Sequence, residues 1–406
     1  MSRFAQRWLV LLVLLGGLLA ACGGSDDDPT ATAGAGSAPT NTVALDGTAS
    51  QPGATTTQPA GQPTQPSGDA ATATTTTGQP PAADATATQP MQTVELTPEE
   101  LQQYKPNELG WIPLLQYHHF VWDVTDPYQR TPDDFRADLQ WLYDHNFYVV
   151  NIHDYIDDTM EVPAGKHPVM LSFDDGAQSQ FRFIPLENGQ LALDAESAIG
   201  VLEQFFRDHP DFGRGGHFSI LPDRTFAWPE HPEQFEYATQ KLEWLLNNGY
   251  EIGNHTLDHA NLAEITPDEV MYQLAEANIM IHQQAPDAVI RIHTLPYGGY
   301  PNGGDDTVFK GFDYNGGYYE YEGVLLVGAN PAVSVLSTEY DPYAIPRIQA
   351  FDEELDKWFS FLVENPDVIY TSDGNPNNVT VPETLHWALV DTLDETKIGG
   401  RTLVRY

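Results

Sequence analysis

The stretch Val169–Phe181, VMLSFDDGAQSQF, decides the fold class, because it sets two acidic residues at the end of an apolar run. Residues 169–173 predict a buried strand. Neighbouring side chains on a strand point to opposite faces, so Asp174 and Asp175 would be costly to bury there without partners. Gly176 allows a sharp turn after them, and the two carboxylates can then emerge at the mouth of an α/β fold.

Short apolar runs alternate with helical patterns along the rest of the folded region, which indicates βα units around a parallel sheet. Thr131 and Pro132 predict the start of one helix, and Thr266 and Glu269 form a capping box at the start of another. The expected strands are 111–117, 147–152, 168–173, 215–221, 250–253, 288–296, 323–328 and 342–351. About seven parallel strands with helices outside favour a (β/α) barrel over an open sheet.

The first 21 residues predict a secretory signal. Arg3 and Arg7 precede an apolar run that is too short to span a bilayer as a mature helix. The run ends in LAAC, and Leu19–Cys22 resembles the bacterial lipobox, whose cysteine becomes the lipidated first residue after cleavage. Cys22 is the only cysteine, which excludes an intramolecular disulfide. We therefore expect a lipoprotein of the cell envelope, anchored to the membrane through Cys22 and facing the extracytoplasmic side.

Residues 22–95 form a second region, rich in Thr, Pro, Ala and Gln, and no Lys or Arg occurs between Arg7 and Lys105. A segment of this composition cannot bury enough apolar surface to offset the entropy of ordering it, so we interpret it as a tether. The remaining residues, 96–406, are numerous enough for one large domain with its own core.

The charge balance restricts the partners. With 18 Lys and Arg against 58 Asp and Glu, the formal net charge is −40, and nucleic-acid phosphates would be repelled. A neutral or cationic polymer is easier to accept. A solvated acidic surface with no partner explains the charge equally well.

Two histidines follow another predicted strand, in the stretch EIGNHTLDHANL. The spacing of His255 and His259 predicts that both imidazoles lie on one side of a helical turn, a common geometry for a shared divalent ion. Two histidines by themselves are weak evidence for a metal, because they could equally be structural histidines with hydrogen-bond partners. Together with one carboxylate from a neighbouring strand end, they make a three-ligand site that leaves positions open for water and substrate.

The motifs SFDDG (172–176) and HTLDH (255–259) resemble the first and second motifs of the NodB-like polysaccharide deacetylases, carbohydrate esterase family 4. The resemblance runs from about Trp111 to beyond Pro346, which is most of the folded region. It implies a distorted, seven-stranded (β/α) barrel and a metal-dependent hydrolase.

In that family the two aspartates have different tasks. The resemblance makes Asp174 the general base, which takes a proton from water. It makes Asp175, His255 and His259 the ligands of one divalent ion, for which Zn²⁺ is the first choice. One acid then stays off the metal and the other stays on it.

The stretch LPYGGYP (295–301) resembles the third motif, in which the backbone N–H of the aromatic residue, here Tyr297, helps to hold the developing oxyanion. Members usually carry an arginine two residues before the proline, where it orients the catalytic aspartate. This chain has Thr294 there. Arg291 lies nearby in sequence, and Arg347 stands at another predicted strand end. We expect Arg347 to be the substitute, with an ordinary ion pair as its alternative role.

The general acid is expected near the first strand. The late histidine motif of the family has no convincing copy here, since His386 lies in ETLHWALV, which predicts a structural helix. The stretch LLQYHHF (114–120) resembles the poly-N-acetylglucosamine deacetylase branch, in which a histidine after the tyrosine is the acid. That residue is His118, and its alternative role is packing at the strand end. Strand alternation then points His119 elsewhere in the groove.

The leading functional hypothesis is hydrolysis of N-acetyl groups from an extracellular or cell-envelope glycan. An O-acetyl, xylan-type carbohydrate esterase is one alternative, since an ester needs less help from an acid. A non-catalytic carbohydrate-binding lipoprotein is the other, favoured by the missing third-motif arginine and opposed by the complete ligand set. The glycan itself is left open, because groove shape depends on loops such as 187–194 and 223–234.

Cys22→Ser is expected to abolish lipid attachment, because the lipid is carried by the cysteine sulfur. A protein that begins at Leu96 is expected to stay folded and active on soluble oligomers. Detergent partitioning and thermal melting measure the two outcomes. A shortened protein that unfolds would show that residues 22–95 contribute structure.

Overall fold

The computed structural model describes residues 95–406. The expected signal segment 1–21, the lipidation site Cys22 and nearly all of the tether 22–95 therefore lie outside the described residues. Within the described part of the chain, no helix combines the length and apolar character that a membrane span needs.

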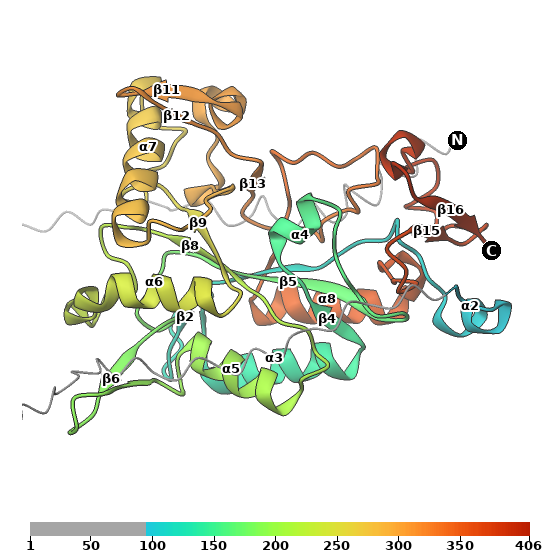
Figure 1. Cartoon of the computed structure of the whole chain (residues 1–406), viewed down its shortest axis with the longest axis horizontal. Coiled ribbons are helices and arrows are strands. Elements are labelled where there is room, and N and C mark those ends of the chain that lie inside the picture. The colour runs from blue at the N-terminus through green and yellow to red at the C-terminus, as the bar shows by residue number, and fades with distance from the viewer. Residues whose placement is uncertain (1–94) are drawn as a thin grey trace, which may run out of the picture. The chain divides into compact units, whose positions relative to one another are not determined.

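A parallel sheet of eight strands forms the centre of the described region (Figure 1). Seven strands follow one another in the order β13-β10-β9-β8-β5-β1-β14, and β4 pairs with β5 off this path. The strands are β1 (Leu114–Tyr117), β4 (Phe147–Val149), β5 (His167–Phe173), β8 (His217–Ile220), β9 (Glu251–Asn254), β10 (Ile292–Thr294), β13 (Gly323–Leu325) and β14 (Ile348–Gln349). The predicted α/β class is confirmed, and each of the eight expected strand segments overlaps one of these strands.

The sheet curls toward closure at its edges. The Val324 N–H donates to the Pro342 carbonyl at 2.8 Å, and Leu325 bridges Ile345 in parallel. Strand β13, at one end of the path, thus meets the segment that leads into β14 at the other end. The fold is therefore a distorted (β/α) barrel, as expected.

Helices cover the outside of this sheet. They are α2 (Pro98–Tyr104), α3 (Pro132–Asp144), α4 (Ile152–Ile156), α5 (Ala198–Asp208), α6 (Ala238–Asn247), α7 (Pro267–Gln284) and α8 (Asp352–Glu364). Figure 1 shows α3 and α5 side by side along one side of the sheet. Thr131 and Thr266 cap α3 and α7 as predicted, and both helices begin with a complete capping box, of which the one at Thr266 was predicted.

Short two-stranded sheets and 3₁₀ turns lie outside the central sheet. Four two-stranded sheets are formed by β2 (His119–Phe120) with β3 (Gln129–Arg130), β6 (Phe183–Pro185) with β7 (Leu191–Leu193), β11 (Phe312–Tyr314) with β12 (Gly317–Tyr319), and β15 (Asn378–Val381) with β16 (Thr402–Arg405). The 3₁₀ turns are η1 (Pro232–Tyr237), η2 (Pro296–Gly298), η3 (Pro301–Gly303), η4 (Thr307–Lys310), η5 (Pro366–Val368) and η6 (Glu395–Ile398). The helix expected around His386 is absent: residues 383–390 form bends and a turn.

Aromatic rings fill the core between β1, β5 and β8. Phe173 stacks on Phe218 with ring centroids 4.6 Å apart, and Tyr117 meets Phe135 of α3 edge-on at 4.8 Å. Parallel strands end at the same edge of a sheet, so residues that follow β1, β5, β9 and β10 meet there. The Asp174 N–H donates to the Tyr117 carbonyl at 2.9 Å, which joins the ends of β5 and β1 directly.

Candidate active site

Asp174, directly after β5, is buried and held by one arginine. Arg347 donates from Nη1 to Oδ1 at 2.7 Å and from Nη2 to Oδ2 at 2.9 Å. The two side chains are 1% and 0% exposed. Burial by itself raises the pKa of the Asp174 carboxyl, but Arg347, His255 and His118 together outweigh burial, and the net pKa lies well below its usual value. The carboxylate is thus fixed in its ionised form.

Arg347 is itself fixed by two further acceptors. Its Nε donates to the Leu326 carbonyl at 2.6 Å, and Nη1 also reaches the Ser172 hydroxyl at 3.2 Å. Arg291, the other arginine near the third motif, instead binds Asp157 and Glu322. The structure therefore brings Arg347, and not Arg291, to the aspartate that the family's third-motif arginine would contact.

Asp175 faces away from that pair, toward the two histidines. Its Oδ1 lies 3.4 Å from His255 Nε2 and 3.4 Å from His259 Nε2. The Nδ1 of His255 lies 2.9 Å from the Thr294 carbonyl, to which it can only donate. That bond leaves the Nε2 lone pair of His255 directed at Asp175, which is the tautomer that a metal ligand needs.

The expected helical turn between the histidines is wrong. His255 directly follows β9, and residues 255–259 form a bend without helical structure. Thr256 and His259 both have φ of 68°, and Asp175 has φ of 76°. Left-handed conformations of residues other than glycine are strained and concentrate at functional sites. The two imidazoles converge through this strained backbone and not through helical periodicity.

The charges of the triad depend on one another. Burial raises and His255 lowers the pKa of Asp175, with a net value of about 2. Burial lowers the pKa of His255, but Asp175 and Asp174 raise it by more. Burial and the neighbouring His255 lower the pKa of His259 to about 4. One carboxylate and two imidazoles with convergent free atoms fit a divalent cation, and these residues are the ones that could hold it.

A second cluster, His153, His217 and Glu251, has the same composition but lies at the amino ends of β8 and β9. The Nδ1 of each imidazole is 3.3 Å from a Glu251 oxygen, and the same carboxylate accepts the backbone N–H groups of Ile152 and His153 at the start of α4. His217 Nε2 is buried without a partner, and a Cβ on Gly253 would lie 2.2 Å from it.

This packing distinguishes the two clusters. If His217 bound an ion through Nδ1, its Nε2 would carry a proton pointing at the Gly253 backbone with no acceptor, which is costly. If Nδ1 carries the proton, it donates to Glu251. The second cluster therefore fits a helix cap, and only the Asp175 cluster leaves its ligand atoms free.

His118 and His119, at the end of β1, face different aspartates. His118 Nε2 lies 3.8 Å from Asp174 Oδ2, whereas His119 Nε2 lies 3.7 Å from Asp175 Oδ2. Burial lowers the pKa of His118, and it outweighs the opposite effect of the two aspartates. His118 therefore points to the Asp174 side of the site and His119 to the Asp175 side, as strand alternation predicts.

Exposed aromatic rings border the site. Tyr297 is 68% exposed, has φ of 57°, and meets His259 edge-on with ring centroids 4.5 Å apart. Tyr128 meets His118 at 4.9 Å, and Trp228 lies 5.7 Å from His119. Tyr128 and Trp228 were not foreseen from the sequence. Both are large aromatic residues in polar loops. A single sequence does not indicate which such loops lie near a site.

Two buried glutamines were also missed. Gln116 and Gln180 contact both Asp174 and His118. The available signal for Gln116 was a polar residue inside the apolar run WIPLLQY, whereas Gln180 lies in the polar stretch before Phe181 and gave no such signal. A buried polar side chain without a visible partner in sequence indicates a site residue.

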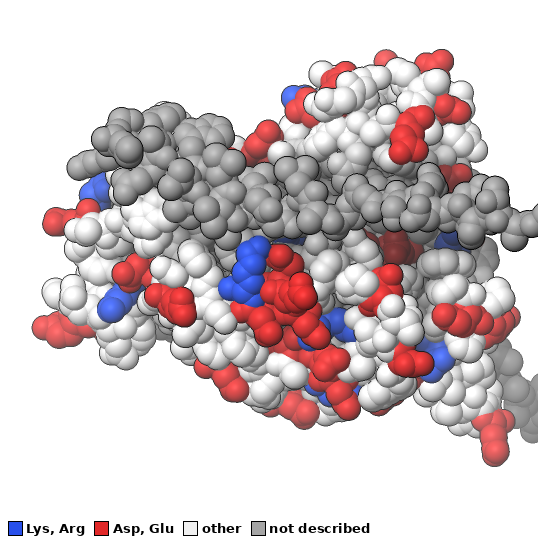
Figure 2. All heavy atoms as spheres, turned by 180° about the vertical axis from the view of Figure 1, so that it is seen from behind, with Lys and Arg blue, Asp and Glu red and all other residues white. Residues whose placement is uncertain are grey.

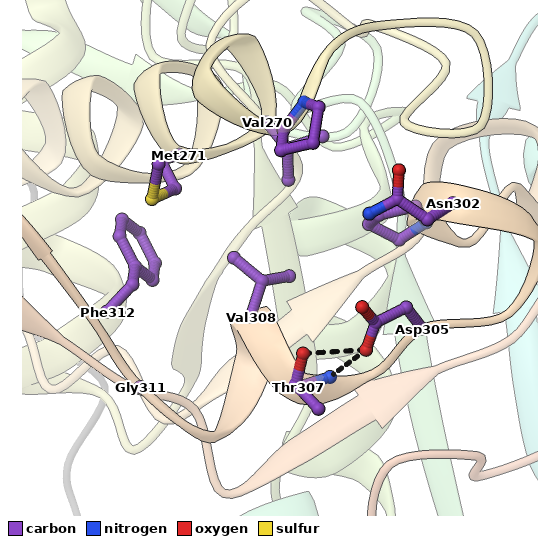
Figure 3. Close-up of a pocket in the computed structure, with 10 residues that line it drawn as sticks. Val270, Met271, Asn302, Asp305, Thr307, Val308, Gly311 and Phe312 are labelled. Atoms are coloured by element: carbon purple, nitrogen blue, oxygen red, sulfur yellow. Dashed lines mark hydrogen bonds between the residues drawn. The ribbon is translucent and has the colours of Figure 1, made fainter.

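A separate pocket of about 300 Å³ lies between the start of α7 and the segment 301–312. Figure 3 shows Met271, Val308 and Phe312 around it, and Asp305 accepts hydrogen bonds from the Thr307 hydroxyl and N–H. No residue of the Asp174 or Asp175 clusters lines this pocket. It is not a part of the site.

Comparisons with known proteins agree with the motifs. The family model described as polysaccharide deacetylase matches residues 225–308, a range that includes His255, His259 and Tyr297. The first motif, with Asp174 and Asp175, lies before this range.

Three solved structures are similar to part of this chain. The Streptococcus pyogenes deacetylase PplD, in complex with acetate, is 16% identical, with 61% of this chain and 97% of that chain covered and a TM-score of 0.45. IcaB from Ammonifex degensii is 16% identical, with 62% and 97% covered and a TM-score of 0.45. A de-N-acetylase from Aggregatibacter actinomycetemcomitans is 16% identical, with 61% and 99% covered and a TM-score of 0.43.

The family match covers the second and third motifs, and the first motif meets the second at the edge of a parallel, barrel-like sheet. Residues 225–308 of the chain thus match the polysaccharide deacetylase family, and they lie within a distorted (β/α) barrel of the NodB-like kind.

Proposed function

We propose that this polysaccharide deacetylase is metal-dependent and removes N-acetyl groups from an extracellular or cell-envelope glycan. The observation that carries the proposal is the division of the aspartate pair. Arg347 holds Asp174 away from the histidines, whereas Asp175, the next residue, faces both of them. A hydrolase that uses a metal and a separate base needs this division.

Asp175, His255 and His259 would hold the ion, and zinc suits one carboxylate and two imidazoles. A divalent ion bound there supplies Lewis acidity, which lowers the pKa of a water molecule and polarises an acyl carbonyl. Thr294 supports the set, since its carbonyl keeps the His255 Nε2 lone pair pointed at the site.

The chain's own residues then supply base, acid and oxyanion contact. Asp174 takes a proton from the attacking water, and the Tyr297 N–H binds the oxygen of the carbonyl as it becomes negative. His118 protonates the leaving nitrogen. Asp174 Oδ2 and His118 Nε2 are 3.8 Å apart. The proton that Asp174 removes from water can therefore be transferred to His118 over a short distance.

An amide substrate is favoured over an ester by this acid. An amine is a poor leaving group and needs a proton as the tetrahedral intermediate collapses, whereas an activated alcohol does not. A histidine beside the base is the feature that an O-acetyl esterase would not require. The exposed rings of Tyr128, Trp228 and Tyr297 offer apolar faces of the kind that line ligand sites.

The charge of the chain fits a neutral or cationic glycan. On the visible face in Figure 2, carboxylates are scattered widely, and Lys and Arg are few. Nucleic acid is disfavoured by the net charge of −40. We further propose attachment to the membrane through a lipid on Cys22, on the extracytoplasmic side, for which the lipobox-like sequence is the support.

His255→Ala is expected to lose the bound ion and deacetylase activity together, because one of three ligands is removed. His217→Ala is the matched control: it removes a buried histidine from the second cluster and is expected to keep about one equivalent of zinc. Elemental analysis after dialysis measures both. Full zinc content in His255→Ala protein, or its loss only in His217→Ala protein, would show that the metal site is misassigned.

His118→Ala is expected to slow acetate release from N-acetylated oligosaccharides by roughly 10²-fold while sparing nitrophenyl acetate, whose leaving group needs no proton. Acetate release and nitrophenol absorbance give the two rates. The same preparation of wild-type protein is assayed on O-acetylated oligosaccharides.

Equal losses of His118→Ala protein on amide and ester would assign His118 a positioning role. Faster wild-type release from O-acetylated than from N-acetylated chains would favour the esterase. Binding of oligosaccharides without any acetate release would favour the non-catalytic lipoprotein.

A further inference from the structure

Two buried glutamines connect the same two residues, and neither has been assigned a role above. We propose that Gln116 and Gln180 are positioning residues that hold Asp174 and His118 as one unit. The inference rests on the proposed function, because it assumes that these two residues are base and acid. Gln116 acts on their side chains, and Gln180 acts on their backbone.

Gln116 lies on β1, two residues before His118, so both side chains project from the same face of the strand. Its Nε2 donates to Asp174 Oδ2 at 3.0 Å and lies 3.4 Å from His118 Nε2. The Gln116 side chain is 1% exposed. One amide nitrogen thus contacts both the carboxylate and the imidazole.

Gln180 lies on the segment after Asp174 and Asp175, and it is fully buried. Its Nε2 donates to the His118 carbonyl at 2.8 Å and also to the Asp174 carbonyl. The Gln180 backbone is fixed in turn, since its N–H donates to Ala177 and its carbonyl accepts from Ile199. The ends of β1 and β5 are therefore clamped from the main-chain side.

The chemistry of the amide explains why glutamine serves here. Its NH₂ group has two protons and no charge, so it can bind two acceptors without adding a cation beside Arg347. The Oε1 atoms of Gln116 and Gln180 are both buried with no hydrogen-bond partner. A flipped Gln116 amide would turn Oε1 toward the Asp174 carboxylate and repel it. The unpaired oxygens show that the NH₂ groups determine both orientations.

The clamp has a definite consequence for the two reactive side chains. An amide nitrogen only donates, so Nε2 of the neutral His118 imidazole, before it takes up the proton that it later donates, is the acceptor in its contact with Gln116. Asp174 and His118 are thereby kept at their separation of 3.8 Å with Nε2 turned toward the carboxylate. Without Gln116, the imidazole loses its hydrogen-bond donor on this side and keeps the ring contact with Tyr128.

Gln116→Met tests this proposal, because methionine keeps the linear shape and removes the donor. Acetate release from N-acetylated oligosaccharides is expected to fall about ten- to a hundredfold, the usual effect of losing a hydrogen bond to a charged group. Nitrophenyl acetate hydrolysis falls less, and zinc content stays unchanged. In a His118→Ala background the same substitution is expected to add little to the loss on the amide, because the two residues act together.

A readout without substrate separates this proposal from the proposed function. The imidazole ¹⁵N resonances of His118, identified by their absence from His118→Ala protein, are expected to shift in Gln116→Met and Gln180→Met proteins. Gln204→Leu, on the exposed face of α5, is the control and leaves them unchanged.

Unchanged His118 resonances in Gln116→Met protein would overturn the proposal, whether or not the wild-type protein releases acetate. Equal losses on amide and ester together with loss of zinc would also overturn it, since they would assign Gln116 a purely structural role. Shifted resonances in a wild-type protein that lacks deacetylase activity would support the clamp and reject the function.

Discussion

The buried ion pair between Arg347 and Asp174 is the interaction on which the rest of the site depends. Both side chains are almost fully removed from solvent, and two parallel hydrogen bonds join them. Removing one partner of such a pair leaves an uncompensated buried charge, which is strongly destabilising. The pair also fixes which of the two adjacent carboxylates faces the histidines, and so it separates the base from the metal ligands.

The two histidine clusters show how packing, and not composition, determines chemistry. Each contains two imidazoles and one carboxylate. At the amino ends of β8 and β9, Glu251 is engaged by backbone N–H groups, and the Gly253 backbone blocks His217. At the carboxyl ends, the Thr294 carbonyl orients His255 so that its free nitrogen faces Asp175. Only the cluster of Asp175, His255 and His259 leaves lone pairs directed at a common point.

The sequence was sufficient for the sheet and for most of the site. The run before Asp174 marks a buried strand, and the strand-end positions of the motifs bring them to one edge of a parallel sheet. Arg347 could be chosen over Arg291 because it stands at a strand end. The strand order and the place where β13 meets the segment before β14 were not readable, since they depend on pairing between segments far apart in sequence.

Other features were missed or wrong for identifiable reasons. The helical turn between His255 and His259 was inferred from spacing, but left-handed residues such as Thr256 produce the same convergence from a loop. Gln116 and Gln180 lie within or beside apolar runs, where a single polar residue carries no signal of its partner. Trp228 lies in a loop whose path is set by distant contacts, including the bond from the Gln178 N–H to its carbonyl.

The central claim is that Arg347 orients Asp174 in place of the absent third-motif arginine. The most direct test is acetate release by Arg347→Lys protein, in which the charge stays and the two parallel hydrogen bonds are lost. The account predicts at least a roughly tenfold lower rate with zinc content and melting temperature near those of the wild-type protein. Wild-type acetate release from a folded, zinc-loaded Arg347→Lys protein would contradict it.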